Sequence, residues 1–263
     1  MIDYHVHTAR CGHADGEMLD YVAQAHKIGL LELGFADHLP LLTQEDPTLT
    51  MTLGELSGYV QEVNSLAEDA DGIIVKLGIE ADYLPGLEGE TAALLASCDF
   101  DYVIGSIHFI DGWGFDDSRY LEGYAQKDIH TIYEDYFRLV AQAAGSGMFD
   151  IIGHLDLVKK YGFRPETDIT GLLEDTVAAL KEAGVCVEIN TAGLRKPVGE
   201  VYPSETILAL CARAGVPITL GSDAHRPDQV GMDFDHALRL AVVAGYRRLA
   251  VFNKRERDYI DIP

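Results

Sequence analysis

Short apolar runs alternate with amphipathic segments along most of the chain. The apolar runs are typical of buried strands and predict strands at Ile2–His7, Leu31–Ala36, Ile73–Glu80, Asp101–His108, Phe149–His154, Val185–Asn190, Pro217–Ser222 and Arg248–Phe252. Between them, apolar residues recur at helical spacing and predict helices at Gly16–Ile28, Thr52–Ala67, Gly89–Ala96, Ile129–Ala144, Ile169–Ala183, Ser204–Ala214 and Phe234–Ala244. This alternation indicates an α/β fold of parallel βα units, closed into a barrel of seven or eight strands.

Turn-forming residues punctuate the same pattern. Gly184 and Gly215 stand where a predicted helix must stop before the next strand, and Pro203 precedes the helix that begins at Ser204. The chain has 263 residues, without repeats or a long linker, and α/β barrels commonly reach this length as one domain. We therefore predict a single domain over residues 1–263.

Side chains that bind metal ions stand at the end of nearly every predicted strand. They come from six separate stretches of sequence: His5 and His7, Asp37 and His38, Glu80, His108, His154 with Asp156, and Asp223 with His225. The C-terminal ends of barrel strands converge on one mouth, where active sites form. So many ionisable groups in one mouth are costly unless they are paired or bound to metal. The sequence therefore predicts a metal site.

The spacing of these residues favours shared ions. Residues two apart on a strand point to the same side, which predicts His5 and His7 on one face and Tyr4 and Val6 on the other. A carboxylate such as Glu80 can bridge two cations because it has two oxygens. Imidazole together with carboxylate favours Zn, Mn or Fe over Ca or Mg. Isolated histidines are more often structural or surface residues, and we interpret in this way those within predicted helices: His26, His130 and His236.

Composition narrows the possible partners. The net charge of −23 disfavours nucleic acid, whose binding depends on Lys and Arg, and it means that a phosphate substrate needs positive charge built inside the site. No apolar run reaches the 18 residues of a membrane span, and the first residues lack the pattern of a signal peptide. The four cysteines form no CxxC pair, which suits a reducing cytoplasm. Cys11, among histidines, is either a packing residue or close to a metal.

Several motifs resemble those of the PHP (polymerase and histidinol phosphatase) superfamily. In order along the chain they are His5-Val-His7, Asp37-His38, His108 within GSIHF, His154 within GHLD, and Asp223 with His225 within GSDAH. Within that superfamily the chain is most similar to the stand-alone histidinol-phosphate phosphatases, in the stretches CGHADGE (Cys11–Glu17), GSIHFIDGWGFD (Gly105–Asp116) and NTAGLRK (Asn190–Lys196). The resemblance spans Asp3 to about Asn253.

The resemblance implies a fold and a trinuclear metal site. The fold is a distorted TIM-like (β/α)7 barrel, which would make the predicted strand Arg248–Phe252 peripheral. The site would hold about three divalent metal ions, Zn, Mn or Fe, with Glu80 as a bridge. One ion would be held by His5, His7, Glu80 and Asp223, a second by Glu80, His108 and His154, and a third by His13, His38 and His225.

The resemblance also implies the hydrolysis of L-histidinol phosphate, a step of histidine biosynthesis. Two neighbouring ions would lower the pKa of a bridging water, and the resulting hydroxide would attack phosphorus in line with the leaving alcohol. The ions would also bring about six positive charges into the acidic protein. We expect the catalytic residues to be Glu80, Asp223, His225 and Arg195.

Further side chains are expected to bind the substrate. Arg195 is the first candidate for the phosphate, because guanidinium fits its oxygens bidentately. Three other basic residues are weaker candidates for the same role: Lys159, Lys160 and Arg10. The imidazole ring and ammonium group of histidinol are expected to meet the loop that holds Trp113, Phe115 and Asp116. Asp37 and Asp156 are candidates to orient ligand histidines. The roles of Glu188 and Asn190 are open.

The sequence leaves alternative functions open. A PHP-type phosphoesterase acting on another small phosphate, such as a nucleotide, uses the same kinds of ligand. A metal-dependent amidohydrolase also has an HxH motif and a late aspartate, but it typically carries a lysine at the end of a central strand, where this chain has Glu80 and His108. A non-catalytic metal or DNA-replication domain is disfavoured by the complete ligand set and the net charge. The native metals and the oligomeric state are not fixed by the sequence.

Overall fold

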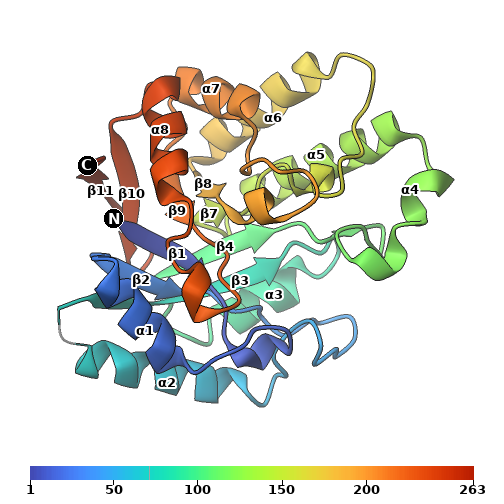
Figure 1. Ribbon diagram of the computed structural model, residues 1–263. Coiled ribbons are helices and arrows are strands. Elements are labelled where there is room, and N and C mark those ends of the chain that lie inside the picture. Colours follow the sequence, from blue (N-terminus) through green and yellow to red (C-terminus); the bar gives the residue numbers. More distant parts are fainter. Residues whose placement is uncertain (71) are drawn as a thin grey trace.

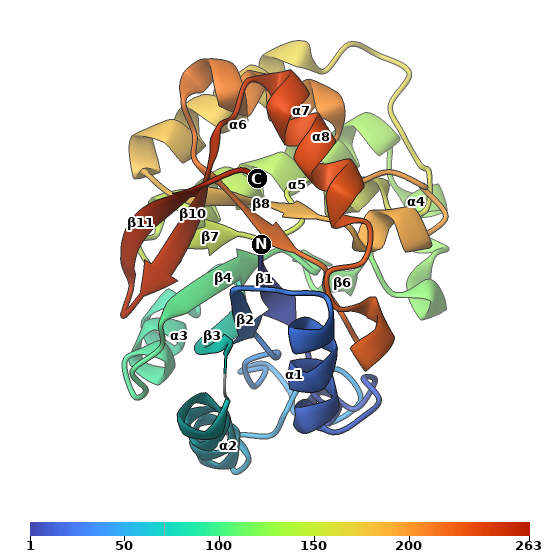
Figure 2. The same ribbon diagram turned by 60° about the vertical axis from the view of Figure 1, so that its left-hand side comes forward.

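A parallel sheet of seven strands forms the centre of the molecule (Figures 1 and 2). The computed structural model describes residues 1–70 and 72–263. Neighbouring strands are parallel. Their order is β1 (Ile2–Val6), β2 (Glu32–Phe35), β3 (Ile74–Asp82), β4 (Tyr102–Ser106), β7 (Ile151–Ile152), β8 (Cys186–Asn190) and β9 (Ile218–Gly221).

The two edge strands of this sheet meet and nearly close it into a barrel. The His7 N–H donates to the carbonyl of Ala224 at 2.9 Å, and the Ala224 N–H donates to the carbonyl of His5 at 3.2 Å. These bonds join the end of β1 to the segment after β9. The predicted distorted TIM-like (β/α)7 barrel is therefore confirmed, and it gathers the C-terminal ends of its strands at one rim.

Helices connect the strands and cover the outside of the barrel. In Figure 1, α1 and α2 lie below the sheet, and α6 and α7 lie above it. The helices are α1 (Met18–Lys27), α2 (Leu56–Asp69), α3 (Glu88–Leu95), α4 (Gly123–Gln126), α5 (Ile129–Gly145), α6 (Thr170–Ala183), α7 (Glu205–Ala214) and α8 (Phe234–Ala244). Short 3-10 helices lie at Ala9–Cys11, Ser118–Tyr120, Leu157–Lys159, Ala192–Arg195 and Pro227–Gln229.

The predicted helices are confirmed, with ends displaced by a few residues at most, whereas the short α4 was not predicted. Two helices end at the glycines where the sequence predicted that they stop. Helix α6 ends at Gly184 and α7 at Gly215, each in the left-handed region with a φ of 73°. Only glycine adopts that conformation without strain.

Two hairpins lie outside the barrel sheet. β5 (Phe109–Ile110) and β6 (Trp113–Gly114) form one in the long loop after β4, and β10 (Arg248–Asn253) and β11 (Glu256–Asp261) form the other. The predicted strand Arg248–Phe252 is thus confirmed as peripheral (Figure 2). β11 was not predicted, because its residues are mostly charged and exposed and give no apolar pattern.

Tyrosines fill the N-terminal half of the barrel interior. The Tyr102 ring lies against Gly34 and Gly78, where the neighbouring strands present no side chain. It stacks on Tyr4 with ring centres 4.7 Å apart. The β10–β11 hairpin covers this end, since the Phe252 N–H donates to the Tyr4 hydroxyl at 3.2 Å. The N-terminal end is therefore packed, and the predicted metal ligands lie at the opposite rim.

The pairing of β1 contains an irregularity that the sequence does not reveal. Its register with β2 shifts between Asp3 and Val6, so that Tyr4 and His5 both face the interior. The prediction that Tyr4 and Val6 share one face of the strand is therefore wrong, because strict alternation fails where a strand bulges.

In the described residues, no helix is both long and apolar enough to cross a membrane. All four cysteines are free thiols. Cys11, Cys186 and Cys211 are buried, and Cys98 is partly buried.

We predict that Gly78→Ala destabilises the barrel from inside. A Cβ atom there would collide with the Tyr102 ring, and overpacking a filled core costs about 1–3 kcal/mol. Chemical denaturation should show this loss in the free energy of unfolding. Gly89→Ala in α3 is the control, because a Cβ there meets nothing within 4 Å, and stability should stay level or rise by up to about 1 kcal/mol. Equal stability of the two variants would contradict the filled interior.

Candidate metal centre

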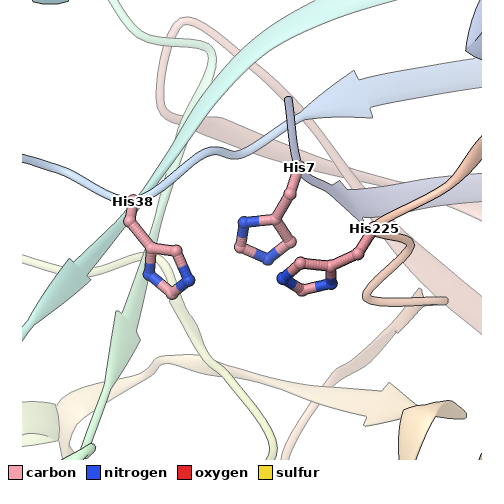
Figure 3. Close-up of side chains that lie close together, drawn as sticks. All are labelled: His7, His38 and His225. Carbon is pink, nitrogen blue, oxygen red and sulfur yellow. The ribbon is translucent and has the colours of Figure 1, made fainter. Parts of the chain in front are cut away.

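The predicted ligands from six stretches of sequence meet at the C-terminal rim of the barrel. Figure 3 shows three of them, His7, His38 and His225, with their rings close together. The ring centre of His7 lies 4.5 Å from that of His38 and 4.1 Å from that of His225. The cluster continues through His5, His108 and His154, with ring centres 5.8 Å apart for His5–His154 and 5.0 Å apart for His108–His154.

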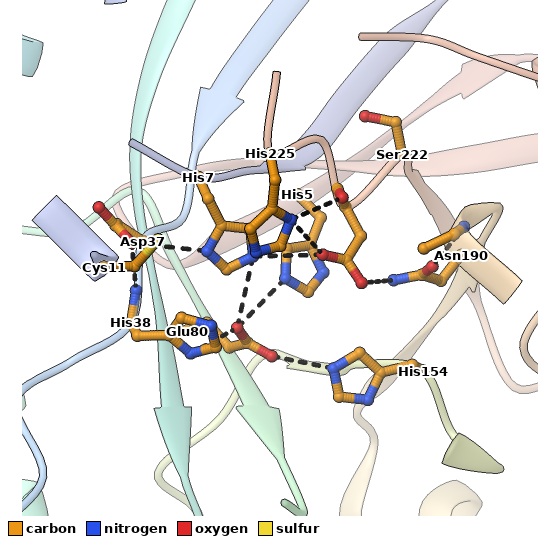
Figure 4. Close-up of polar contacts among 12 residues, drawn as sticks. His5, His7, Cys11, Asp37, His38, Glu80, His154, Asn190, Ser222 and His225 are labelled. Carbon is orange, nitrogen blue, oxygen red and sulfur yellow. Dashed lines mark hydrogen bonds and ion pairs between the residues drawn. The ribbon is translucent and has the colours of Figure 1, made fainter. Parts of the chain in front are cut away.

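Glu80 stands at the centre of this cluster with 1% of its surface exposed (Figure 4). Its Oε1 lies 3.0 Å from His154 Nε2 and 3.7 Å from His108 Nε2. Its Oε2 lies 3.0 Å from His38 Nδ1 and 3.3 Å from His5 Nε2. The two oxygens face different histidines, an arrangement in which one carboxylate can bridge two cations.

Two of the predicted ligands sit on strained backbone. His154 and Asp223 have φ angles of 23° and 52°, in a region that residues other than glycine rarely adopt. From this position Asp223 Oδ1 lies 3.4 Å from His7 Nε2 and 3.4 Å from His225 Nδ1. Such strain persists only where the surroundings enforce it, and it gathers at functional sites.

His13 reaches the cluster from the loop after β1. Its Nδ1 donates to the carbonyls of Cys11 and Thr48, at 2.8 and 3.2 Å, and its Nε2 then carries the free lone pair. Its ring centre lies 4.8 Å from that of His225 and 5.5 Å from that of His38. The structure thus brings these three histidines together, as the resemblance implied.

Cys11 lies beside the cluster as a buried thiol. Its sulfur lies within 4.8 Å of ligand atoms of His13 and His225, but its S–H donates to the Thr8 carbonyl at 3.1 Å. Burial, reinforced by the nearby Asp37, raises the pKa of Cys11 to about 12. These contacts favour the packing role over a ligand role.

Several buried atoms of the cluster lack partners. They are His5 Nε2, His7 Nδ1, Glu80 Oε2 and His154 Nδ1. Glu80 Oε2 lies close to His38 and His5, but none of the contacts of these four atoms has the geometry of a hydrogen bond. An unsatisfied buried polar atom costs about 1–3 kcal/mol, whereas a cation accepts lone pairs from imidazole and carboxylate alike. These donors are ones that first-row divalent ions such as zinc prefer. The cluster therefore fits a divalent metal centre.

Burial and crowding set the charges within the cluster. Burial lowers the pKa of His38 well below its usual value, although Glu80 opposes this. Burial would raise the pKa of Glu80, but His38 and His5 outweigh it and hold that pKa well below its usual range. Burial also lowers the pKa of His7, but hydrogen bonds to carboxylates, that of Asp223 first, outweigh it and raise the pKa to about 9. A metal ion must therefore displace a proton at His7, whereas His38 offers a free lone pair.

A pocket of about 390 Å³ opens onto the cluster. Its lining includes three cationic side chains, Lys160, Arg195 and Lys196. Arg195 Nη2 donates to the Ser222 carbonyl at 2.6 Å, while its buried Nη1 has no partner. Lys160 Nζ lies 3.0 Å from Asp116 Oδ2, and Asp116 also lines the pocket. These cations beside the cluster suit a phosphate group.

Three predicted substrate-binding residues do not line this pocket. Lys159 is buried with its Nζ 2.9 Å from Asp156 Oδ2, so this aspartate holds a lysine rather than a ligand histidine. Arg10 Nη2 pairs with Glu62 Oε2 at 2.6 Å. Trp113 packs within its own loop and donates from Nε1 to a backbone carbonyl. Their partners hold these side chains away from the pocket, and the sequence does not reveal such pairing.

Phe115 was expected, with Trp113, to meet the ring of the substrate. It is instead fully buried in the core.

Other residues near the ligands carried weaker sequence signals. Asp37 Oδ1 lies 3.5 Å from His7 Nδ1, beside a predicted ligand, and its orienting role stays a prediction. Asp82 Oδ1 lies 2.9 Å from His108 Nδ1 and was missed, although it follows a ligand by two positions on β3 and so shares its face. Lys196 was missed because a lysine in a loop resembles ordinary surface charge.

We predict that divalent metal stabilises the folded protein. A ligand that binds only the folded state adds about 2.7 kcal/mol at 100-fold its Kd. Zinc or manganese should raise the melting temperature of chelator-treated protein. The rise should be larger at about pH 8 than at about pH 6, because fewer protons then compete for His7, whose pKa is raised to about 9. Calcium should act weakly. A melting temperature that does not respond to zinc would count against a metal centre.

Comparisons with known proteins identify relatives over nearly the whole chain. Residues 3–192 match the PHP domain family. The chain is 41% identical over 240 residues to the probable histidinol-phosphatase of Deinococcus radiodurans. The match covers 91% of this chain and 92% of that protein. It is 29% identical over 262 residues to the histidinol-phosphatase of Bacillus subtilis, with 89% and 96% covered.

A solved structure shares both fold and sequence. The histidinol phosphate phosphatase of Lactococcus lactis, crystallised in complex with zinc, L-histidinol and phosphate, superposes with a TM-score of 0.84 at 27% identity and covers 98% of each chain. The protein therefore belongs to the PHP domain family, and the relatives named above are histidinol-phosphatases.

Proposed function

We propose that the protein is a metal-dependent phosphomonoesterase that hydrolyses L-histidinol phosphate to L-histidinol and phosphate, a step of histidine biosynthesis. The observation that carries this proposal is the pocket in which cationic side chains face the carboxylate–imidazole cluster. Similarity to histidinol-phosphatases supports the same substrate, as does the Lactococcus structure that holds zinc, L-histidinol and phosphate.

The cluster is proposed to hold about three divalent ions, Zn, Mn or Fe. Bound ions of this kind supply Lewis acidity and lower the pKa of coordinated water. Glu80 would be shared between two ions, because its oxygens face different histidines. The proposed ligands are His5, His7, His13, His38, Glu80, His108, His154, Asp223 and His225.

Arg195 is proposed to hold and orient the phosphate. Its guanidinium is anchored on the backbone beside the proposed ligand Asp223. Its Nη2 lies 2.6 Å from the Ser222 carbonyl and 3.4 Å from the Asp223 carbonyl. Its unpartnered Nη1 is available for a phosphate oxygen. Lys160 and Lys196 add positive charge in the same pocket, which offsets the acidic character of the whole chain.

Other lining residues suit the organic part of histidinol. Phe109, Tyr120 and Leu157 offer apolar surface for the imidazole ring, in place of Trp113. Asp116 offers a carboxylate for the ammonium group, although Lys160 already neutralises part of its charge. The ring and the amine would thus be recognised by different residues of one pocket.

We place this activity in one barrel domain over residues 1–263, which would act in the cytoplasm on a small-molecule phosphate. Nucleic acid is an unsuitable partner, because the net charge of −23 repels it.

A panel of substrates tests the function. Phosphate release should be fastest from L-histidinol phosphate, compared with AMP and an aryl phosphate, because only histidinol offers both a ring and an ammonium group. Chelator and His7→Ala should each abolish it, since both remove metal. Equal rates on the three substrates would reject the substrate, and full activity after exhaustive metal removal would reject the mechanism.

Arg195→Met should lower kcat/KM for L-histidinol phosphate by about 100-fold or more, the usual effect of losing a donor to the transferring group. Arg10→Met is the matched control, because Arg10 pairs with Glu62 outside the pocket, and its kcat/KM should stay within about twofold of the original protein. Steady-state kinetics with melting temperatures measures both. Full activity in Arg195→Met would remove Arg195 from the proposed site.

A further inference from the structure

Glu188 on β8 is a buried carboxylate that the proposed reaction does not use. It is 1% exposed and lies inside the barrel beneath the ligands. Its Oε1 accepts from His5 Nδ1 at 2.6 Å. Its Oε2 accepts from the backbone N–H of His154 at 2.8 Å and from Asn190 Nδ2 at 3.1 Å. One side chain therefore contacts three segments that carry proposed ligands or their partners.

All of these partners act as donors. The backbone N–H of His154 can only donate. Asn190 Oδ1 accepts from the Ala192 N–H at 2.9 Å, so the amide is oriented with Nδ2 toward Glu188. The same Nδ2 lies 3.3 Å from Asp223 Oδ2. A carboxylate accepts at both of its oxygens, whereas a glutamine of the same size would turn an NH₂ group against a donor.

A glycine leaves the space that this carboxylate occupies. A Cβ at Gly221 would collide with Glu188 Oε1. Gly221 ends β9 and lies two residues before Asp223. The end of β9 thus lacks a side chain at the point where Glu188 approaches the segment that carries Asp223.

The bond to Glu188 decides which nitrogen of His5 is free to bind a cation. Because a carboxylate only accepts, His5 Nδ1 carries a proton, and in the neutral imidazole that binds a cation Nε2 then keeps its lone pair. That Nε2 is buried without a hydrogen-bond partner, and it lies 3.3 Å from Glu80 Oε2 at the centre of the cluster.

We propose that Glu188 is a positioning residue for the metal centre. It fixes His5 in the tautomer that coordinates through Nε2, and it holds the His154 backbone and, through Asn190, the Asp223 carboxylate. The inference rests on the proposed metal site but not on the identity of the substrate. Partners of this kind typically contribute about 10- to 100-fold in metal affinity.

Glu188→Gln tests this role with almost no change in size. An amide that turns its NH₂ group toward His5 makes Nδ1 an acceptor and moves the proton to Nε2, the atom that faces the cluster. The opposite orientation sets the NH₂ group against the His154 N–H and Asn190 Nδ2. Zinc affinity, measured by competition with a chromophoric chelator, should therefore fall roughly 10- to 100-fold at one ion of the cluster.

Thr219→Val is the matched control. Thr219 pairs in register with Glu188 on the neighbouring β9, and its buried hydroxyl has no partner. This substitution alters the same layer of the barrel without touching a ligand, so zinc affinity should be unchanged. Unchanged zinc affinity in Glu188→Gln as well would overturn the proposal, whereas an equal loss in both variants would reduce it to general packing.

A measurement on the unaltered protein keeps the proposal testable if Glu188→Gln does not fold. In zinc-loaded protein with ¹⁵N-labelled histidine, the His5 signals are those missing from His5→Gln. The proposal requires a protonated Nδ1 and a zinc-bound Nε2, and zinc on Nδ1 would overturn it. A protein that binds zinc in this way but leaves L-histidinol phosphate intact would reject the proposed substrate and not the role of Glu188.

Discussion

The site depends on the compensation of one buried charge, the Glu80 carboxylate among imidazoles at the barrel rim. A carboxylate removed from water is stable only beside opposite charge. Protonated histidines can supply some of it, but burial lowers the pKa of His38 and His225 well below the usual value, and the positive charge of His7 adds to this effect. Divalent cations resolve the conflict, because they balance the carboxylate and also bind neutral imidazoles.

The packed core and the proposed metal site lie at opposite ends of the barrel. Tyr4 and Tyr102 fill the N-terminal end, where Gly34 and Gly78 make room for the Tyr102 ring. The C-terminal rim carries the proposed ligands, and Glu188 lies between these layers, where it bonds to His5 and to the His154 backbone. Two of the proposed ligands are thus held by a carboxylate within the barrel interior.

The sequence could predict the barrel and its ligand-bearing rim, because strand–helix alternation and polar strand ends follow from general rules of the fold. It could not predict that Tyr4 faces inward, since a bulge interrupts the alternation that the prediction assumed. It also misplaced Lys159, Arg10 and Trp113. Long side chains point toward partners brought by distant segments, such as Glu62 for Arg10, and nothing local records that choice. Lys196 was overlooked for a different reason, because a lysine in a loop resembles ordinary surface charge.

The central claim is that the clustered imidazoles and carboxylates exist to bind cations. The most direct test is the anomalous difference map of crystals grown from zinc-saturated protein. Peaks should lie about 2.0–2.3 Å from His5 Nε2 and from ligand atoms of Glu80 and Asp223. A map with full zinc occupancy elsewhere and no peak within the cluster would contradict this account.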